Sequence, residues 1–358
     1  MTTLLGLATH HPGTRLGAAD AAAVLAALGT PTVAPRGPMP AQRWAIAQPW
    51  RAAVAPTLGA RARLAAVEVA RLGAHAGRQA LAAAEQRPAA VRVLIVCSST
   101  LAGTVPTPDA GIGDALGLRG DVIRLPLLGL GCGALGRAMS LGVALLQQTG
   151  DPRGVALLVA AETCSVWAPS GESSPADVDA ALTLGDGAGA LVLGPHGGAG
   201  PALLASRAAH WPGTSAARGA VVTDLGLRHT LSPQHLRAAL RHLPGTVSRF
   251  LADAGTAPAA LDFCVVNPPF GAAVEATAQL LRDESATRPL AERTWHEAGN
   301  TLSAGLAHGL RALTEGAAPR RGALGLTLCL SAGMSCELTL LRWGDRPPVA
   351  HDCGPLLH

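Results

Sequence analysis

The sequence contains no lysine and no tyrosine, so each of its 28 basic residues is an arginine. Chemistry that needs a lysine Schiff base or a tyrosine acid is therefore excluded. Aromatic residues are scarce, at 3% of the chain. The seven cysteines include no CxxC pair, so neither a zinc site nor a disulfide framework is indicated. We expect no bound metal.

Long apolar runs and a strong net charge are also missing. No stretch reaches about 18 consecutive apolar residues, and the first residues lack the charged start of a signal peptide. We therefore expect no leader, no membrane contact and a cytoplasmic location. The net charge is +4 and the arginines are scattered along the chain, which argues against nucleic-acid binding.

The chain is long and contains enough apolar residues to form a large core. Its 358 residues are 49% hydrophobic and 15% charged, which is typical of two fused domains or one large layered body. Apolar periodicity predicts two helices and three buried strands. The helices span residues 20–28 and 60–85, and the strands span residues 3–9, 91–97 and 155–163. Residues 181–194 are interpreted as a glycine-rich turn between two short strands.

One cysteine lies at a glycine-rich bend before a long apolar helix, in the stretch Arg124–Gln148. Cys132 stands between Gly131 and Gly133, and glycine permits both a tight turn and the close approach of a ligand. A thiol in the first turn of a helix is near backbone N–H groups and the positive end of the dipole, which favour the thiolate. The stretch by itself fits either a nucleophile or a small core residue.

The second half of the chain repeats the order of the first. LAAAEQRPAAVRVLIVCSS from Leu81 and LADAGTAPAALDFCVVNPP from Leu251 align without gaps at a spacing of 170 residues. The same spacing carries Cys132 close to Asn300, which lies at another glycine bend before a helix. We interpret this pattern as an internal duplication. It would bring the two helix starts to one central site, with Asn267 at the same end of the sheet.

Six motifs in this order resemble those of one family: GLGCGALG, AAETCS, LGDGAGALVLG, NPPFGAAVEATAQLL, EAGNTLSAG and LSAGMSCELTLLRW. They are similar to motifs of the type III polyketide synthases, chalcone and stilbene synthase-like enzymes of the ketoacyl synthase III branch of the thiolase-like superfamily. The resemblance implies an α/β fold of five layers, αβαβα, with internal duplication. It also implies a homodimer. The nucleophile would lie in an N-terminal half over residues 1–215, followed by a C-terminal half over 216–348 and a tail over 349–358.

The resemblance implies an acyltransferase that uses CoA or carrier-protein thioesters as substrates and needs no cofactor. In this family a cysteine is acylated, and a histidine and an asparagine then decarboxylate malonyl-CoA and stabilise the enolate that attacks the acyl-enzyme. Cys132 matches the nucleophile and Asn300 matches the asparagine, but the histidine position is occupied by Asn267. An amide has no useful acid–base pKa, although two amides would still supply an oxyanion hole. We therefore expect acylation to survive better than decarboxylation.

The resemblance also marks positions that would contact substrate. Two phenylalanine gatekeepers of the plant enzymes correspond to Leu184 and His229. A histidine at the mouth of the site would partly replace the missing imidazole; a packing or surface histidine is the alternative. Ser99 is a candidate for lining the pocket. Arg43 and Arg51 are candidates for binding the phosphates of CoA.

Three functions stay open on the sequence alone. The first is an acyltransferase that condenses the acyl group with malonyl-CoA or passes it to another nucleophile, and intact Cys132 and Asn300 favour it. The second is a non-catalytic subunit that partners an active homologue, and Asn267 favours it. The third is a thiolase-like enzyme of another reaction, such as thioester hydrolysis. The starter, the number of condensations and the mode of ring closure are not indicated.

Overall fold

The computed structural model describes most of the chain. The described residues are 2–29, 38–46, 57–101, 105–169, 171, 173–195, 200–268, 271–281, 287–316, 318–345 and 349–353. Their helices are α1 Ala21–Ala27, α2 Leu58–Ala83, α3 Pro108–Leu116, α4 Ala134–Thr149, α5 Pro175–Thr183, α6 Pro233–Leu240, α7 Leu243–Asp253, α8 Ala272–Leu281, α9 Thr287–Ala298 and α10 Gly305–Glu315.

The strands of the first half are β1 Thr2–His10, β2 Thr14–Gly17, β3 Gln42–Ala45, β4 Val91–Ser98, β5 Ile123–Leu128, β6 Val155–Glu162 and β7 Gly187–Pro195. Those that follow are β8 Ala202–His210, β9 Arg218–Thr223, β10 Gly226–Leu231, β11 Phe263–Asn267, β12 Leu324–Ser331, β13 Ser335–Arg342 and β14 Val349–Cys353. Ten of the strands form one mixed sheet in the order β11-β12-β13-β8-β1-β7-β6-β4-β5, with β14 paired to β1.

The same four-strand arrangement occurs twice in this sheet. In the first half β4 runs parallel to β6, β6 antiparallel to β7, and β7 antiparallel to β1. In the second half β11 runs parallel to β12, β12 antiparallel to β13, and β13 antiparallel to β8. The two Pro-Ala-Ala segments form equivalent 3₁₀ turns before β4 and β11, at Pro88–Ala90 and Pro258–Ala260. This repetition supports the predicted internal duplication.

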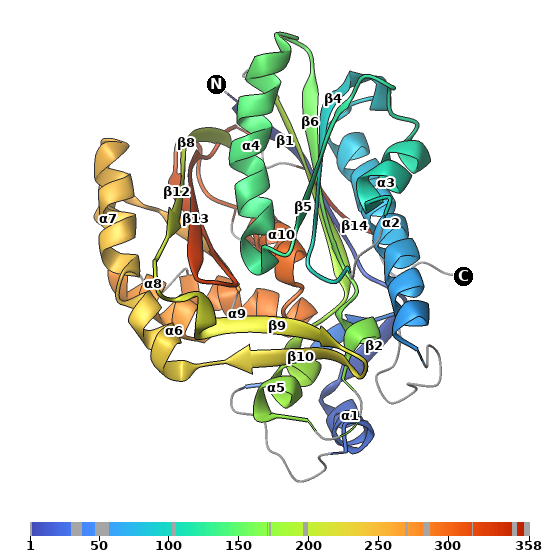
Figure 1. The fold of residues 1–358 in the computed structure, drawn as a ribbon. Helices are drawn as coiled ribbons and strands as arrows, with labels where there is room; N and C mark the ends of the chain where they lie inside the picture. The colour runs from blue at the N-terminus through green and yellow to red at the C-terminus, as the bar shows by residue number, and fades with distance from the viewer. Residues whose placement is uncertain are drawn as a thin grey trace.

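The helices and the sheet form five layers (Figure 1). Helices α4 and α10 lie between the two halves of the sheet, α2 and α3 cover the outer face of one half, and α7 and α8 cover the other. Leu135 and Met139 of α4 pack with Leu306 and Leu310 of α10 in the central apolar cluster. Apolar residues on both faces of each half-sheet therefore bury the central strands, whereas β5 and most of β8 stay partly exposed. The predicted five-layered α/β fold class is confirmed.

The secondary structure of one segment differs from the prediction. Residues 181–194 were expected to hold a turn between two strands, but α5 extends to Thr183 and only β7 follows the turn. The helix is favoured by a capping box, in which Ser174 Oγ accepts a hydrogen bond from the Asp177 N–H at 3.2 Å and the Asp177 carboxylate accepts one from the Ser174 N–H.

The predicted division at residue 215 concerns folding units and stays a prediction. In the sheet, β8 lies before that position and pairs with β13 of the second half. Residues 349–353 of the predicted tail form β14, which runs parallel to β1. The end of the described chain is therefore joined to its beginning through backbone hydrogen bonds.

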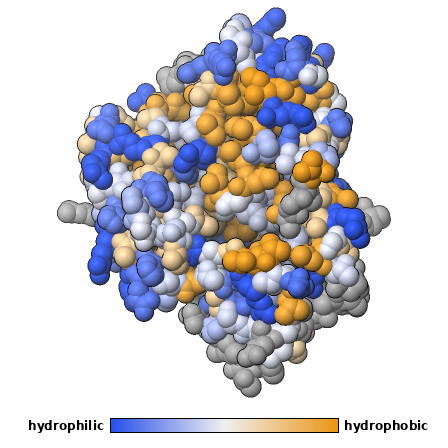
Figure 2. All heavy atoms as spheres, in the orientation of Figure 1, coloured by the Kyte–Doolittle hydropathy of each residue, from blue (hydrophilic) through white to orange (hydrophobic). Residues whose placement is uncertain are grey.

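Apolar atoms gather on one face, near α4 and along the β9–β10 hairpin, as Figure 2 shows. Leu128, Val221, Val222 and Leu225 are between 43% and 61% exposed there. In the part of the chain that the structure describes, none of the helices is both long enough and apolar enough to cross a bilayer.

Candidate active site

Cys132 lies in the 3₁₀ turn Gly131–Gly133, which leads directly into α4. Gly131 has a φ of +60°, a conformation that favours glycine. A Cβ at Gly133 would collide with Ser331 of β12, so the close approach of the second half-sheet also requires glycine. These constraints hold the thiol at the start of α4, where Cys132 is only 5% exposed.

The Cys132 thiol is hydrogen-bonded to Asn300. Cys132 Sγ donates to Asn300 Oδ1 at 3.5 Å, and the backbone N–H of Leu302 donates to the same oxygen at 3.0 Å. The second bond sets the orientation of the amide and leaves Asn300 Nδ2 buried without a partner among the described residues. The 3₁₀ turn Leu302–Ala304 before α10 contacts the Cys132 turn. The two helix starts therefore meet at one point, as the duplication predicts.

Burial decides the resting protonation state of Cys132. Removal of the side chain from water raises the pKa of its thiol to about 11, and the positive charge of Arg218 opposes that rise without cancelling it. The helix start favours the thiolate, as the sequence indicates, but burial outweighs it and the resting sulfur is a thiol. The dipole at the helix start does not offset the lost hydration of an almost fully covered sulfur.

Asn267, the last residue of β11, is hydrogen-bonded to both the Cys132 turn and the Leu302 turn. Its Nδ2 donates to the carbonyl oxygen of Cys132 at 2.7 Å and to that of Leu302 at 2.9 Å. Its Oδ1 faces Gly305, where a Cβ would collide with it. Both amide protons are therefore engaged by backbone carbonyls, and Asn267 is fully buried. The predicted two-amide oxyanion hole is not the arrangement found, because Asn267 has no N–H left to offer.

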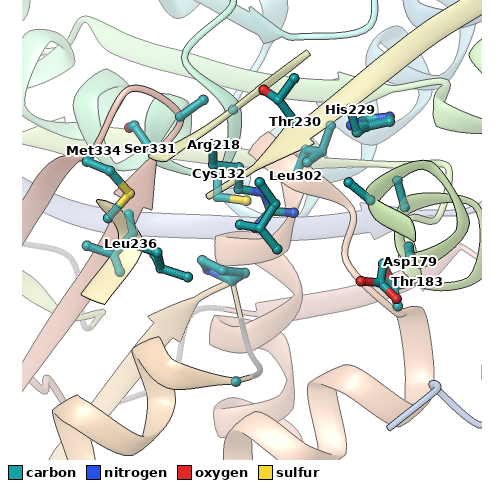
Figure 3. A pocket seen from close by; sticks show the side chains of 18 of the residues that line it. Cys132, Asp179, Thr183, Arg218, His229, Thr230, Leu236, Leu302, Ser331 and Met334 are labelled. Carbon is teal, nitrogen blue, oxygen red and sulfur yellow. The ribbon is translucent and has the colours of Figure 1, made fainter. Parts of the chain in front are cut away.

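A cavity of about 330 Å³ opens beside Cys132 (Figure 3). Its walls are mainly apolar and come from β10, α6, the Leu302 turn and the β12–β13 connection. They include Leu231, Leu236, Leu240, Leu302, Leu330 and Met334. Among the described residues, the titratable side chains on its wall besides Cys132 are Asp179, Arg218 and His229. This space suits an acyl chain attached to the sulfur.

His229 lines this cavity and is held by its backbone, whose N–H donates to Asp177 Oδ1 at 2.7 Å. Burial, followed by the charge of Arg218, lowers the pKa of its imidazole to about 4. The ring is therefore neutral at neutral pH, and so low a pKa makes it a weak base. No hydrogen bond joins it to Cys132 among the residues described. The other predicted gatekeeper, Leu184, lies with His229 on a smaller neighbouring cavity.

The remaining predicted contacts lie away from the thiol. Ser99 Oγ accepts a hydrogen bond from the Gly131 N–H at 2.7 Å, so this side chain supports the Cys132 bend. Arg43 is 5% exposed and donates to the carbonyl of Ala181 at 2.6 Å. Its guanidinium points into the protein, so the structure does not bring it to a place where it would meet CoA phosphates. Arg51 lies outside the described residues.

Two further residues belong to the site: Glu162, which the family resemblance links to folding or pocket lining, and Arg218, which the sequence analysis missed. Glu162 accepts hydrogen bonds from the Ser99 N–H at 2.9 Å and the Thr100 hydroxyl at 2.8 Å, and also from the Ser303 hydroxyl. Its signal was a carboxylate ending an otherwise apolar strand. Arg218 faces the cavity from the start of β9. No local motif marks Arg218, because its neighbours in the site are distant in sequence.

Because two histidines are buried in the neutral form, we expect the free energy of unfolding to decrease in acid. Burial lowers the pKa of His11 to about 3 and that of His229 to about 4. Below pH 6.5 the unfolded chain therefore binds more protons, and stability falls as the pH drops toward 4. Asp186, whose pKa burial raises to about 6, acts in the opposite direction between about 4 and 6. From pH 7 to 5 each histidine contributes a loss of about 2 kcal/mol.

The measurement is the free energy of urea unfolding at pH 7 and pH 5. His11→Gln should flatten the difference between the two values. A stability that stays constant or increases toward pH 5 would show that these histidines are protonated in the folded protein.

Comparisons with known proteins agree with this geometry. Residues 47–197 match the family described as chalcone and stilbene synthases, N-terminal domain. A 1,3,6,8-tetrahydroxynaphthalene synthase from Streptomyces peucetius subsp. caesius is 29% identical over 255 residues, which are 70% of this chain and 67% of that protein. The chain therefore resembles the type III polyketide synthases.

The structure of the Streptomyces coelicolor A3(2) 1,3,6,8-tetrahydroxynaphthalene synthase, a bacterial type III polyketide synthase, superimposes on this chain with a TM-score of 0.86. The two share 22% identity over 96% of this chain and 99% of that one. The acetoacetyl CoA synthase NphT7 of Streptomyces sp. (strain CL190) is 28% identical over 298 residues, 76% of this chain and 83% of that protein. The predicted family resemblance and thiolase-like fold are confirmed.

Proposed function

We propose that this protein is an acyltransferase in which Cys132 receives an acyl group from a CoA or carrier-protein thioester. The observation that carries the proposal is the Cys132 thiol, hydrogen-bonded to Asn300 at 3.5 Å beside a cavity of about 330 Å³. In this step the sulfur attacks the thioester carbonyl, a new C–S bond forms and the bond to the CoA sulfur breaks. The thiol proton leaves with the CoA thiol, so no oxidant or further reactant is needed.

In this proposal each site residue has a separate part. Cys132 is the nucleophile, and Asn300 accepts its S–H in the resting state. Neutral His229 lies on the same cavity, where it would relay the thiol proton to the leaving CoA sulfur through water or substrate. Asn267 holds the two turns in place. The relatives named for polyketide synthesis and for acetoacetyl CoA synthesis support acyl transfer as the shared step.

The test is a panel of acyl-CoAs of increasing chain length, read by intact-protein mass and by released product. A mass increase equal to one acyl group, faster for some chain lengths than for others, is expected. Release of free acid without a condensed product would move the assignment to thioester hydrolysis.

Malonyl-CoA should lose CO₂ slowly compared with acyl transfer to Cys132. Asn267 has no proton to exchange and both its N–H groups are engaged, so the developing enolate receives no help from it. Losing a general acid–base group lowers rates by about 10²–10⁴-fold. The measurement compares formation of acetyl-CoA from malonyl-CoA with the rate of Cys132 acylation. Asn267→His should increase the decarboxylation rate, and fast decarboxylation by the wild type would contradict this assignment.

A second candidate is an accessory subunit that keeps the fold and supports an active homologue. The use of Asn267 as a structural tie rather than as an acid–base group favours it. The two candidates differ in one observable. An accessory subunit has no acyl adduct with any thioester, whereas an acyltransferase accumulates one.

We also propose that the protein is a cytoplasmic homodimer. Exposed apolar side chains of a soluble enzyme commonly mark a contact surface. Leu128, the last residue of β5 and close to the Cys132 bend, is 44% exposed, and Val221 of the hairpin is 61% exposed. A dimer that covers this face would remove these apolar side chains from water.

A further inference from the structure

We propose that Arg218 makes the Cys132 cavity selective for short acyl thioesters that carry a free carboxylate at the far end of the acyl chain. The inference rests on the proposed acyltransferase function and names the substrate class of that same site.

Arg218 is held in place at the cavity wall. It begins β9 and pairs with Leu231 of β10, and its carbonyl accepts a hydrogen bond from the Gly333 N–H at 3.3 Å. The side chain lines the cavity together with Cys132, and Figure 3 shows it beside the Cys132 sulfur. Its positive charge acts on both Cys132 and His229. A rigid strand therefore presents a cation next to the reacting atom.

The Arg218 guanidinium is not paired with any carboxylate of the described residues, and none of them accepts a hydrogen bond from it. Other partly buried arginines near the site are paired. Arg137 contacts Glu337 at 2.7 Å and Arg228 contacts Asp177 at 3.2 Å. A half-buried cation facing an apolar wall is unfavourable unless an anion joins it. A carboxylate fits best, because guanidinium and carboxylate form two parallel hydrogen bonds.

The remaining charges of the cavity indicate where that carboxylate would lie. Figure 3 shows Asp179 beside Thr183, on another part of the wall from Arg218. Arg218 therefore attracts a negative group to the region near the Cys132 sulfur, and Asp179 repels it from the other part of the cavity. His229 is neutral and does not compete with Arg218 for an anion. A chain of a few carbons ending in a carboxylate satisfies both conditions.

The same contact would protect the carboxylate from loss as CO₂. Decarboxylation removes the negative charge from the group that Arg218 holds and releases a neutral molecule. A salt bridge to the starting carboxylate stabilises the substrate more than the transition state, so it opposes that step. Acylation of Cys132 leaves the carboxylate unchanged and retains the salt bridge throughout.

The first experiment compares succinyl-CoA with butyryl-CoA, which have four-carbon acyl chains and differ in the terminal carboxylate. Initial rates of Cys132 acylation are read by intact-protein mass. The wild type should prefer succinyl-CoA by about tenfold or more, as a charged hydrogen-bonded pair predicts. Arg218→Leu should abolish this preference and Arg218→Lys should partly retain it. The matched control Arg249→Leu, on the exposed side of α7, should leave the ratio unchanged.

A second experiment needs no thioester. Cys132 is alkylated with iodoacetate and with iodoacetamide, which differ in charge but react with the same sulfur. Arg218→Leu should slow iodoacetate by about tenfold more than iodoacetamide. An equal loss for both reagents would show that Arg218 only favours the thiolate and would overturn carboxylate recognition. If no thioester acylates the protein, the acyltransferase function fails, while the alkylation ratio still decides the role of Arg218.

Discussion

Incubation with an acyl-CoA should add one acyl mass to the protein, and Cys132→Ala should abolish that adduct completely. Cys132 is the one described cysteine whose thiol lies on the 330 Å³ cavity. Its thiol has a pKa of about 11, so acylation should accelerate as the pH rises above neutrality. The protonated fraction falls in that direction, and the thiolate is the attacking form. Intact-protein mass and peptide mapping measure both results.

Cys164→Ala is the matched control. Its thiol lies on the smaller neighbouring cavity, and burial raises its pKa well above the usual range. The variant should retain the adduct at the wild-type rate. Labelling that persists in Cys132→Ala, or that disappears in Cys164→Ala instead, would assign the nucleophile to another residue.

Asn267→Leu should lower the free energy of unfolding by about 2–6 kcal/mol. The substitution keeps a similar volume but removes the donor for two buried carbonyls, those of Cys132 and Leu302. Each buried acceptor left without a partner costs about 1–3 kcal/mol. The loss should also slow acylation, because the two turns that position the thiol are no longer tied together. Urea unfolding measures the stability, and the adduct rate measures the positioning.

Thr327→Val is the control for burial of a polar group in the same region. Thr327 lies on β12 opposite Val265 of β11, is 1% exposed, and its hydroxyl has no partner among the described residues. Removing that hydroxyl should leave stability unchanged or increase it. A Thr327→Val loss as large as that of Asn267→Leu would mean that the hydrogen bonds of Asn267 contribute nothing specific.

Local sequence patterns were sufficient to predict much of the fold. Apolar periodicity located α2, β4 and β6 to within a few residues, because each buries apolar side chains at its own period. The glycine pair around Cys132 located the bend, and the repeated Pro-Ala-Ala segments located the duplication. The first of the two short strands expected in residues 181–194 is instead the last turn of α5, a helix that starts at a capping box the sequence analysis did not use.

The roles of the site residues, unlike the fold, could not be predicted from local sequence patterns. The sequence by itself determined which residues are available: a thiol between two glycines, an asparagine at the matching bend, and an amide where the family has an imidazole. Only the tertiary structure decided what they do. It buries Cys132 as a thiol, uses both N–H groups of Asn267 on backbone carbonyls, turns Arg43 inward and brings Arg218 to the sulfur. Desolvation and hydrogen-bond pairing depend on neighbours that are at least 35 residues away in the chain, and no local pattern carries that information.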